Sequence, residues 1–506
     1  MEENVAIIDL GSNSVRILVI KINFNSSYKM IDQFKEMVRL SEGMWEDNLL
    51  KETAIERTIA ALKQFKNILK SHNVNKTIAI ATAAVRNSVN GKAFLQRVYS
   101  ETEFNFNVIS GEEEAYLDYL GVINSIDIEN CIIIDTGGGS TELILVKDRK
   151  VQNSISIPYG AVTLTEMYLD GDALKENIVK AEEFIRSIYQ QISWLDEANN
   201  VAVVGLGGSI RTLSKIHKKK HGFLNQSMHN YNIASKDIHE MYDIITSLKS
   251  NELKNIPGLK KERADIIAGG LIPLKVLLDF IGSDRLIVSG NGLREGAFFK
   301  HYFDKYKLNG EIVNSVLQHS IDNVLLKYDV DLQHSYRIRK LSLDLYDQLD
   351  SLHQLDGSYR KLLEVGSLLH DVGLHIDYYD HHYHGFYLAI NSKINGLSYR
   401  ELVICAFIVG MHRNEDFKQD WADYYPVINQ DDYNAIQKLS LFVRISEELC
   451  KSQNGNIKEL KCSIKKNNVN IIPINYEYSG IELPTYLQSE KAFKKIFFSN
   501  MNVKSE

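Results

Sequence analysis

The sequence predicts two similar α/β halves followed by a mostly helical region, and three observations support this prediction. Two segments, 5–16 and 131–142, share one design: an apolar β run, an aspartate, and a turn rich in glycine and hydroxyl residues. Strand-like and helix-like patterns alternate through residues 1–300, which is typical of α/β layering. From about residue 305, helical patterns follow one another with few strands between them.

The elements of the two halves follow from hydrophobic periodicity. One apolar helical face predicts the first long helix: Ile55, Ile59, Leu62, Phe65 and Leu69. β-Branched runs predict strands in the first half at 5–9, 77–81 and 107–109, with a helix after residue 86. The second half is predicted to hold strands at 131–135, 143–146, 154–157 and 201–205, and a long helix at 174–195.

The C-terminal part, from about residue 303, is predicted to be mostly helical. Helices are predicted at 316–326, 336–349, 362–369 and 399–409, and short alternating runs at 461–464 and 469–472 indicate β-structure. A chain of 506 residues is too long for one hydrophobic core, so several domains are expected. We predict α/β domains at 1–125 and 126–302, a helical domain at 303–458 and a small β-containing appendage at 459–506.

Composition excludes several classes of protein. The net charge of −7 argues against general nucleic-acid binding, although a local basic cleft can still attract an anionic substrate. The longest strongly apolar stretch, Leu402–Met411, is about half a membrane span, so no membrane span is expected. The start of the chain lacks the pattern of a signal peptide, and the four cysteines lack metal-like spacing. Both features favour a cytoplasmic protein with reduced cysteines.

The first glycine turn carries more polar groups than a structural turn requires. Backbone N–H groups, hydroxyls, an amide and a guanidinium occur close together in Gly11, Ser12, Asn13, Ser14 and Arg16. Such a turn lets the backbone approach an anion, so these residues are predicted to bind phosphate. Asp9, at the end of the preceding strand, is predicted to face a metal ion or a water molecule.

The second turn has three consecutive glycines, which are costly in a strand unless the backbone must approach another group closely. The residues predicted to bind phosphate here are Gly137, Gly138, Gly139, Ser140 and Thr141. Asp135 and Glu142 flank them and suit Mg²⁺, which is held by one or two carboxylates, waters and substrate phosphates. The alternative is that Glu142 is a solvated residue of an edge strand.

Between the two turns lie three adjacent carboxylates, Glu112, Glu113 and Glu114. They fit the acidic first turn of a helix, or one of them points into a cleft and activates a water molecule. Spacing alone does not distinguish these alternatives. Arg86 follows a central strand, where its planar guanidinium either clamps a phosphate or forms a surface ion pair.

Seven motifs occur in a fixed order and carry a resemblance. They are Asp9-Leu-Gly-Ser-Asn-Ser-Val-Arg, Ala-Thr-Ala-Ala-Val-Arg86-Asn-Ser, Ile-Ser-Gly-x-Glu-Glu114-Ala, Asp135-x-Gly-Gly-Gly-Ser-Thr-Glu, Gly205-Leu-Gly-Gly-Ser-Ile-Arg-Thr, Glu262-Arg-Ala-Asp-Ile-Ile and Val288-Ser-x-x-Gly-Leu-Arg-Glu-Gly. Over nearly the whole chain, this order resembles the exopolyphosphatase and guanosine pentaphosphate phosphohydrolase (Ppx/GppA) family. The resemblance implies duplicated ribonuclease-H-like halves of the actin, sugar kinase and Hsp70 superfamily.

The resemblance also implies roles for individual residues. The catalytic glutamate of the family precedes the alanine, which is Glu114 here. Asp135 and Glu142 match groups that position metal and water, and Arg86 matches a phosphate contact. The chain departs from many relatives at Ala268, where they carry proline, at a position away from the chemistry.

A third glycine turn, with Gly207, Gly208 and Ser209, matches the place where superfamily members hold a nucleotide. We expect it to bind phosphate, with a structural hinge as the alternative. The nearby segment 217–221 (His-Lys-Lys-Lys-His) is predicted to be a solvated basic loop, with attraction of a long polyanion as its alternative role.

The C-terminal half resembles the metal-dependent HD phosphohydrolase domain. His334, His370 and Asp371 are the candidate metal ligands, because histidines and a carboxylate from separate helices suit a divalent ion. Glu447 stands where the last aspartate of that domain is expected. Further histidines add candidate ligands or anion contacts: His375, His381, His382, His384 and His412. A helical domain that extends the substrate path and dimerises is the favoured interpretation.

The predicted function is Mg²⁺-dependent release of orthophosphate from the end of inorganic polyphosphate. Three alternatives are a guanosine pentaphosphate (pppGpp) phosphohydrolase at the same site, a sensor of polyphosphate or nucleotide that binds without turnover, and a sugar or acetate kinase of the shared fold. The predicted state is a cytoplasmic homodimer without a nucleic-acid partner.

Overall fold

The structure is a computed structural model that describes residues 2–44, 47–169, 175–222, 227–306, 310–413, 417–450, 457–474 and 486–503. The chain divides into two compact units, Met1–Val316 and Leu317–Glu506. Among the described residues, no helix combines the length and apolar character needed to cross a membrane.

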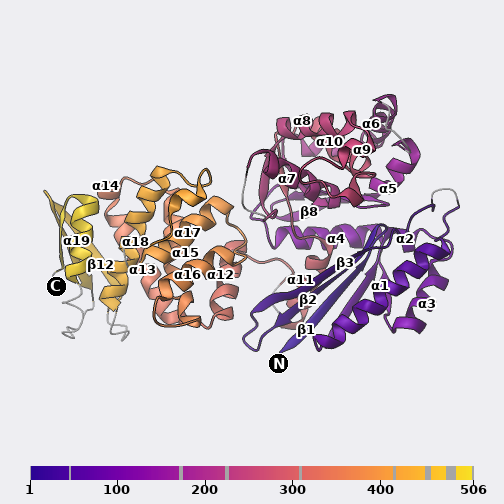
Figure 1. The fold of residues 1–506 in the computed structure, drawn as a ribbon. Helices are drawn as coiled ribbons and strands as arrows, with labels where there is room; N and C mark the ends of the chain where they lie inside the picture. The colour runs from indigo at the N-terminus through magenta and orange to yellow at the C-terminus, as the bar shows by residue number, and fades with distance from the viewer. Residues whose placement is uncertain are drawn as a thin grey trace. The chain divides into compact units, whose positions relative to one another are not determined.

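The first sheet of unit 1 has five strands in the order β3-β2-β1-β4-β5 (Figure 1). Their bounds are β1 Glu3–Leu10, β2 Ser14–Ile22, β3 Tyr28–Met37, β4 Lys76–Ala81 and β5 Phe106–Val108. Strand β1 pairs antiparallel with β2 and parallel with β4. The sheet therefore combines a hairpin meander with parallel strands that need helical crossovers.

The second sheet repeats this plan with six strands in the order β10-β11-β9-β6-β7-β8. Their bounds are β6 Cys131–Thr136, β7 Thr141–Lys147, β8 Lys150–Ile157, β9 Ala202–Gly207, β10 Tyr231–Ala234 and β11 Arg285–Val288. Strand β6 pairs antiparallel with β7 and parallel with β9, as β1 does with β2 and β4. The predicted duplication of α/β halves is confirmed.

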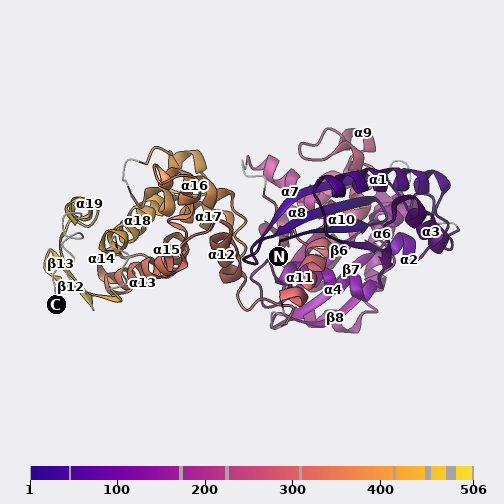
Figure 2. The ribbon, with the colours of Figure 1, turned by 90° about the horizontal axis from the view of Figure 1, so that it is seen from below.

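Helices cover both sheets and connect them. The helices of unit 1 are α1 Glu52–Ser71, α2 Ala83–Arg86, α3 Gly91–Thr102, α4 Gly111–Ile123, α5 Ala161–Leu164, α6 Lys175–Tyr189, α7 Gly208–Lys220, α8 Ser235–Ser247, α9 Ser250–Leu253, α10 Ile267–Ile281 and α11 Leu293–Tyr306. One core includes buried residues of β1, β6, α4 and α11, so α4 and α11 join the two sheets (Figure 2). At Gly296 a Cβ would collide with the Leu117 backbone, which explains a glycine at this crossing.

Two sequence predictions differ from the structure. The helix predicted at 174–195 is shorter: α6 ends at Tyr189 and a 3₁₀ turn follows at Ser193–Ala198, while residue 174 lies outside the described residues. The segment predicted as a basic loop is the last turn of α7. His217 and Lys218 are buried there, and Lys218 Nζ lies 4.2 Å from the centre of the Tyr231 ring, because the lysine packs under the neighbouring strand β10.

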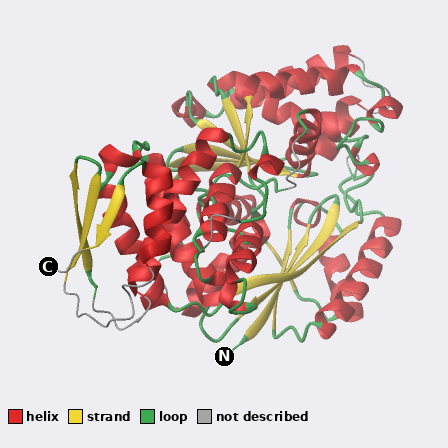
Figure 3. Ribbon diagram, turned by 60° about the vertical axis from the view of Figure 1, so that its left-hand side comes forward, coloured by secondary structure: helices red, strands yellow, loops and turns green. Residues whose placement is uncertain are grey.

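Unit 2 is mostly helical, as predicted (Figure 3). Its helices are α12 Val316–Lys327, α13 Leu332–Gln348, α14 Asp350–His353, α15 Ser358–Leu369, α16 His381–Asn391, α17 Tyr399–Met411, α18 Gln430–Cys450 and α19 Tyr486–Phe497. They pack around one core that also receives the small sheet β12 Glu459–Lys465, β13 Asn468–Ile474 and β14 Asn500–Val503. The predicted β appendage therefore exists, with α19 beside it.

Candidate active site

The two glycine turns lie at equivalent ends of the two sheets and contact each other. Each turn joins an antiparallel pair, so Asp9 lies opposite Arg16 across β1 and β2, and Asp135 lies opposite Glu142 across β6 and β7. A Cβ built on Gly138 would lie 2.9 Å from the Ser12 Cβ. The absence of a side chain at Gly138 therefore allows the two turns to meet.

A cavity of about 100 Å³ opens where the turns meet. Most residues predicted to bind phosphate or metal line it: Asp9, Gly11, Ser12, Asn13, Ser14, Arg16, Asp135, Gly137, Gly138, Ser140, Gly207, Gly208 and Ser209. Glu114 also lines it. Side chains distant in sequence thus converge on one polar space between the two sheets.

Four predicted site residues lie outside the described wall of this cavity: Arg86, Gly139, Thr141 and Glu142. The Thr141 hydroxyl donates to the Tyr159 carbonyl at 2.7 Å. Glu142 is buried behind the wall, and its Oε1 accepts a hydrogen bond from Ser156 Oγ at 2.8 Å. The alternative of a solvated Glu142 is therefore wrong.

The three adjacent carboxylates, Glu112, Glu113 and Glu114, point in different directions from the first turn of helix α4. Glu113 caps helix α4, because its carboxylate accepts from the Ser110 backbone N–H at 2.8 Å and Ser110 Oγ accepts from the Glu113 N–H. Glu112 is exposed. Glu114 turns inward, where Arg86 Nη1 donates to its Oε2 at 3.0 Å. Of the three, Glu114 alone therefore faces the cavity.

Five carboxylates gather around this site: Asp118 and Glu142 are buried, and Asp9, Glu114 and Asp135 are half-buried. Burial is the largest cause of a raised pKa in each of them, and it raises the pKa of Glu114 to about 7. Neither oxygen of Asp118 has a hydrogen-bond partner, and Asp135 Oδ1 also lacks one. Because buried charges need partners, this excess of carboxylate oxygens fits a divalent cation.

Asp118 was not predicted as a site residue from the sequence. It lies four residues after Glu114 on helix α4, and this spacing places both side chains on one helical face. The spacing was a usable signal, although it says nothing about the neighbours contributed by β6 and β7. Those neighbours, Asp135 and Glu142, are the largest electrostatic causes of the raised Asp118 pKa after burial.

The third glycine turn forms the N-terminus of helix α7. Gly207 has a φ of +94°, and a Cβ there would lie 2.6 Å from the Thr136 carbonyl oxygen. Glycine therefore permits both the left-handed backbone and the close approach to β6. The free N–H groups of the first turn of α7 lie at the cavity, where a helix N-terminus favours an anion.

A second cavity adjoins the first and is strongly basic. The two share Arg16, Gly208, Arg211, Arg263 and Arg294. Its basic lining residues are Arg16, Lys35, Arg211, Lys215, Lys260, Arg263 and Arg294, and its described lining holds no acidic residue. Glu262 and Glu295 lie just outside this lining, 3.8 Å from Lys260 and 3.6 Å from Arg294. Burial, with Arg263 and Arg16 nearby, lowers the pKa of Lys35 to about 7. Apart from Arg16, sequence analysis assigned these cations no role, because they come from separate elements.

The residues predicted as a second metal site also meet in the structure. Asp371 Oδ2 lies 3.6 Å from His334 Nε2 and 3.3 Å from His370 Nε2. Glu447 Oε2 lies 2.8 Å from His334 Nε2. This site lies entirely within unit 2.

Comparison with models of protein families shows which family the chain belongs to. The model of the Ppx/GppA phosphatase family matches residues 18–303, and the model of Ppx/GppA phosphatase domain III matches residues 316–482. This chain belongs to the Ppx/GppA phosphatase family. Membership confirms the resemblance and the actin-like fold of the two halves. Domain III covers the predicted helical domain, whose likeness to HD domains stays a prediction.

Individual relatives of the Ppx/GppA family agree with this assignment. A bifunctional 3-dehydroquinate synthase/phosphatase of Fusobacterium nucleatum is 33% identical over 308 residues, which are 58% of this chain and 46% of that protein. The chain thus spans about half the length of this curated relative. A solved Ppx/GppA family member from Aquifex aeolicus is 31% identical, with a TM-score of 0.52, covering 61% of this chain and all (100%) of the other. A solved exopolyphosphatase from Cytophaga hutchinsonii, 22% identical with a TM-score of 0.57, covers 60% of this chain and 98% of its own, and shows the same fold.

Proposed function

We propose that the chain is an exopolyphosphatase, which hydrolyses the terminal phosphoanhydride bond of inorganic polyphosphate with Mg²⁺ and releases orthophosphate. The predicted cytoplasmic homodimer belongs to the same proposal. Family membership supports a phosphatase, and the lining of the two joined cavities supports the substrate.

The observation that carries this proposal is the junction of two cavities that share four arginines. The first also holds carboxylates and glycine turns, and the second adds three lysines, with no acidic residue in its described lining. A terminal phosphate fits the first, and the chain of further phosphates continues into the second. A row of cations matches a polymer that carries charge at every unit, because local basic clefts attract polyanions despite a net negative protein.

The side chains of the first cavity suit attack by water on the terminal phosphorus. Backbone N–H groups of the turns and Arg16 hold the phosphoryl oxygens. Glu114 orients the water and accepts its proton as the new P–O bond forms. The bond from the terminal phosphorus to the bridging oxygen breaks, and its electron pair stays on the shortened chain. Arg211 and Arg263 line both cavities, and their charge can offset the negative charge that develops on the leaving chain.

The carboxylates fit the implied Mg²⁺. The predicted ligands Asp9, Asp135 and Glu142 gather with the unpartnered Asp118, which adds two oxygens to an all-oxygen donor set. Mg²⁺ prefers such oxygen donors together with phosphates and waters. When bound, the ion offsets the negative charge of the phosphoryl group.

One observation favours pppGpp hydrolysis as a second candidate. Phe34 and Met228 also line the basic cavity, and they offer apolar surface on which a guanine base can pack. The 5′-triphosphate would then occupy the same positions as the end of polyphosphate.

Phosphate release from long-chain polyphosphate and from pppGpp, each with and without Mg²⁺, tests the proposal. We expect Mg²⁺-dependent release with a higher kcat/KM for polyphosphate. Release from pppGpp alone would favour the second candidate, and tight binding without release would favour the sensor. Glu114→Gln protein prepared in parallel controls for contaminating phosphatases.

A further inference from the structure

Two histidines and an aspartate of unit 1 meet where helix α7 ends and helix α8 begins. His217 lies in the last turn of α7, His221 directly follows that helix, and Asp237 lies in the first turn of α8. One nitrogen of each histidine and one carboxylate oxygen of Asp237 all lie within 4.8 Å of one another. These three residues lie outside the described lining of both cavities, so they form a separate group of donor atoms.

The spacing of the two histidines places them on one face of the helix. The His221 backbone N–H donates to the His217 carbonyl at 3.1 Å, so helical geometry extends to His221. Residues four apart are neighbours on a helix surface, and the two rings are accordingly close, with centroids 4.3 Å apart and planes at 39°. Two histidines at this spacing can hold one metal ion together.

Asp237 adds a carboxylate from the neighbouring helix. Its Oδ2 lies 3.3 Å from His217 Nε2. Two ligands at about 2.1 Å from one ion lie roughly 3.0–3.4 Å apart at octahedral or tetrahedral angles, so this pair already has the spacing of two ligands. Because His221 is exposed, its side chain can adopt another rotamer to close the wider separations.

The hydroxyl of Tyr231, in strand β10, orients the buried histidine. His217 is only 7% exposed, and its Nδ1 lies 2.7 Å from the Tyr231 hydroxyl oxygen. With an ion at Nε2, Nδ1 carries the proton and donates to this oxygen, which is the second contact typical of a metal-bound histidine. Burial is the largest cause of a lowered His217 pKa, and the neutral imidazole is the form that binds metal.

The lysines around this group have other partners. Lys220 Nζ donates to Glu240 at 2.7 Å. Lys218 Nζ lies over the Tyr231 ring and donates to the Ser227 carbonyl. These contacts balance part of the lysine charge, and the C-terminus of α7 adds partial negative charge that favours a cation.

We propose that His217, His221 and Asp237 hold one divalent transition-metal ion of the zinc, cobalt and nickel class. Imidazole nitrogens suit these ions, whereas Mg²⁺ prefers oxygen donors. Three protein ligands leave a fourth position for water. The ion ties the end of α7 to the start of α8, and this site does not depend on the function proposed for the two cavities.

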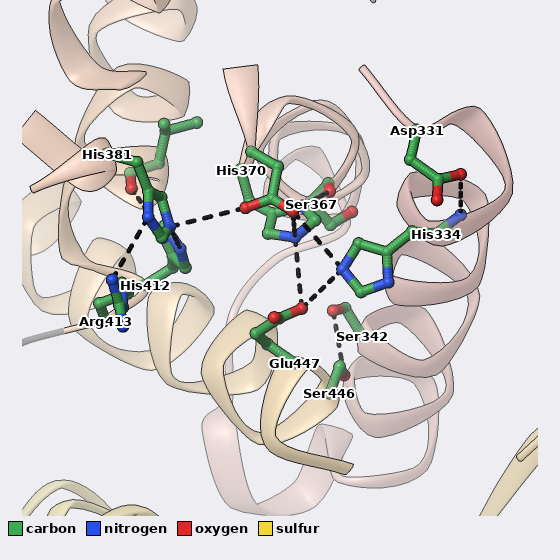
Figure 4. Close-up of polar contacts among 12 residues, drawn as sticks. Asp331, His334, Ser342, Ser367, His370, His381, His412, Arg413, Ser446 and Glu447 are labelled. Atoms are coloured by element: carbon green, nitrogen blue, oxygen red, sulfur yellow. Dashed lines mark hydrogen bonds and ion pairs between the residues drawn. The ribbon is translucent and has the colours of Figure 1, made fainter. Parts of the chain in front are cut away.

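Zinc binding to the full chain tests this site. Unit 2 contains the predicted metal site around His334 and His370 (Figure 4), so ion counts must be compared between variants. Equilibrium dialysis against buffered Zn²⁺ with excess Mg²⁺, followed by elemental analysis, gives the number of Zn²⁺ per chain. We expect His221→Gln to hold one Zn²⁺ fewer than the wild-type protein, because it loses one of three ligands. Equal counts would overturn the proposal.

Two further variants test how the ion is held. Tyr231→Phe keeps the ring but removes the hydroxyl, so it should weaken binding of the ion that His221→Gln loses by about ten- to a hundredfold. Unchanged binding would overturn the role of Tyr231. Lys219→Gln changes an exposed residue between the two histidines and is the matched control, which should keep the wild-type count. Loss of one ion there as well would overturn the assignment to the histidines.

Anomalous diffraction at the zinc edge locates the ion without any substitution. Crystals of the full chain grown with Zn²⁺ should show a peak about 2.1 Å from His217 Nε2 and from a carboxylate oxygen of Asp237. Peaks confined to unit 2 would overturn the proposal, even if one of the variants failed to fold.

Discussion

Glu114 and Arg86 form an ion pair at the active-site cavity, with 3.0 Å between Oε2 and Nη1, and Arg86 also donates to the Ile109 carbonyl at 2.9 Å. Despite this cation, burial raises the pKa of Glu114 to about 7. A carboxylate with such a pKa is a better proton acceptor near neutral pH than an ordinary glutamate. Arg86 therefore lies where it orients the proposed base.

Glu114→Gln should lower kcat for phosphate release by roughly 10²–10⁴-fold, because the amide cannot accept the proton of the attacking water. Substrate affinity should change little, since the amide keeps the shape of the side chain. Glu112→Gln, on the exposed face of the same helical turn, is the control and should retain wild-type turnover. Wild-type turnover in Glu114→Gln would contradict the proposed base.

Asp118→Asn should raise the Mg²⁺ concentration needed for half-maximal activity by about ten- to a hundredfold, if Asp118 holds or orients the ion. The same change should raise the melting temperature of the metal-free protein, because it removes a buried carboxylate without a partner. Mg²⁺ titration of activity and thermal melts in chelator measure the two effects. A lower melting temperature with an unchanged Mg²⁺ requirement would indicate a purely structural Asp118.

The metal-free protein should lose stability as pH rises from 4.5, the ordinary value for glutamate, through about 7. A carboxyl with a raised folded-state pKa binds more protons when folded than when unfolded in this window, so deprotonation favours unfolding. Asp118 and Glu142, whose pKa values are raised well above ordinary values, extend the loss to higher pH. Denaturant unfolding in chelator at several pH values measures this slope, and Mg²⁺ should reduce it. A flat profile without metal would argue that these carboxylates are already neutralised by protein groups.

Lys215→Ala combined with Lys260→Ala should raise KM for long polyphosphate at low ionic strength by roughly three- to tenfold per charge, with kcat nearly unchanged. Each exposed charge contributes about 1 kcal/mol near a phosphate in water, and this contribution is screened by salt. Lys219→Ala, an exposed lysine of α7 outside the basic cavity, is the control. Equal KM values in both variants would mean that the chain does not enter this cavity.

Much of the active site could be predicted from the sequence. Turns that approach an anion need glycine and hydroxyl residues in consecutive positions. The turns Gly11–Arg16 and Asp135–Glu142 can therefore be recognised from a short stretch of sequence. Among Glu112, Glu113 and Glu114, spacing alone left open which one turns inward, and the structure shows Glu113 in the helix cap and Glu114 at the cavity. The duplicated halves follow from the same repeated pattern.

Tertiary structure decided the rest, because packing brings together residues that no local pattern connects. It paired Arg86 with Glu114, buried Glu142 behind the cavity, and placed Asp118 among the other carboxylates. It also assembled the basic cavity from separate segments, and it placed His217 and Lys218 of the predicted basic loop in the buried side of a helix end. By itself, the sequence determined where the glycine turns form. Only the arrangement of sheets and helices decided which charges meet beside them, since electrostatic partners are set by distance in space.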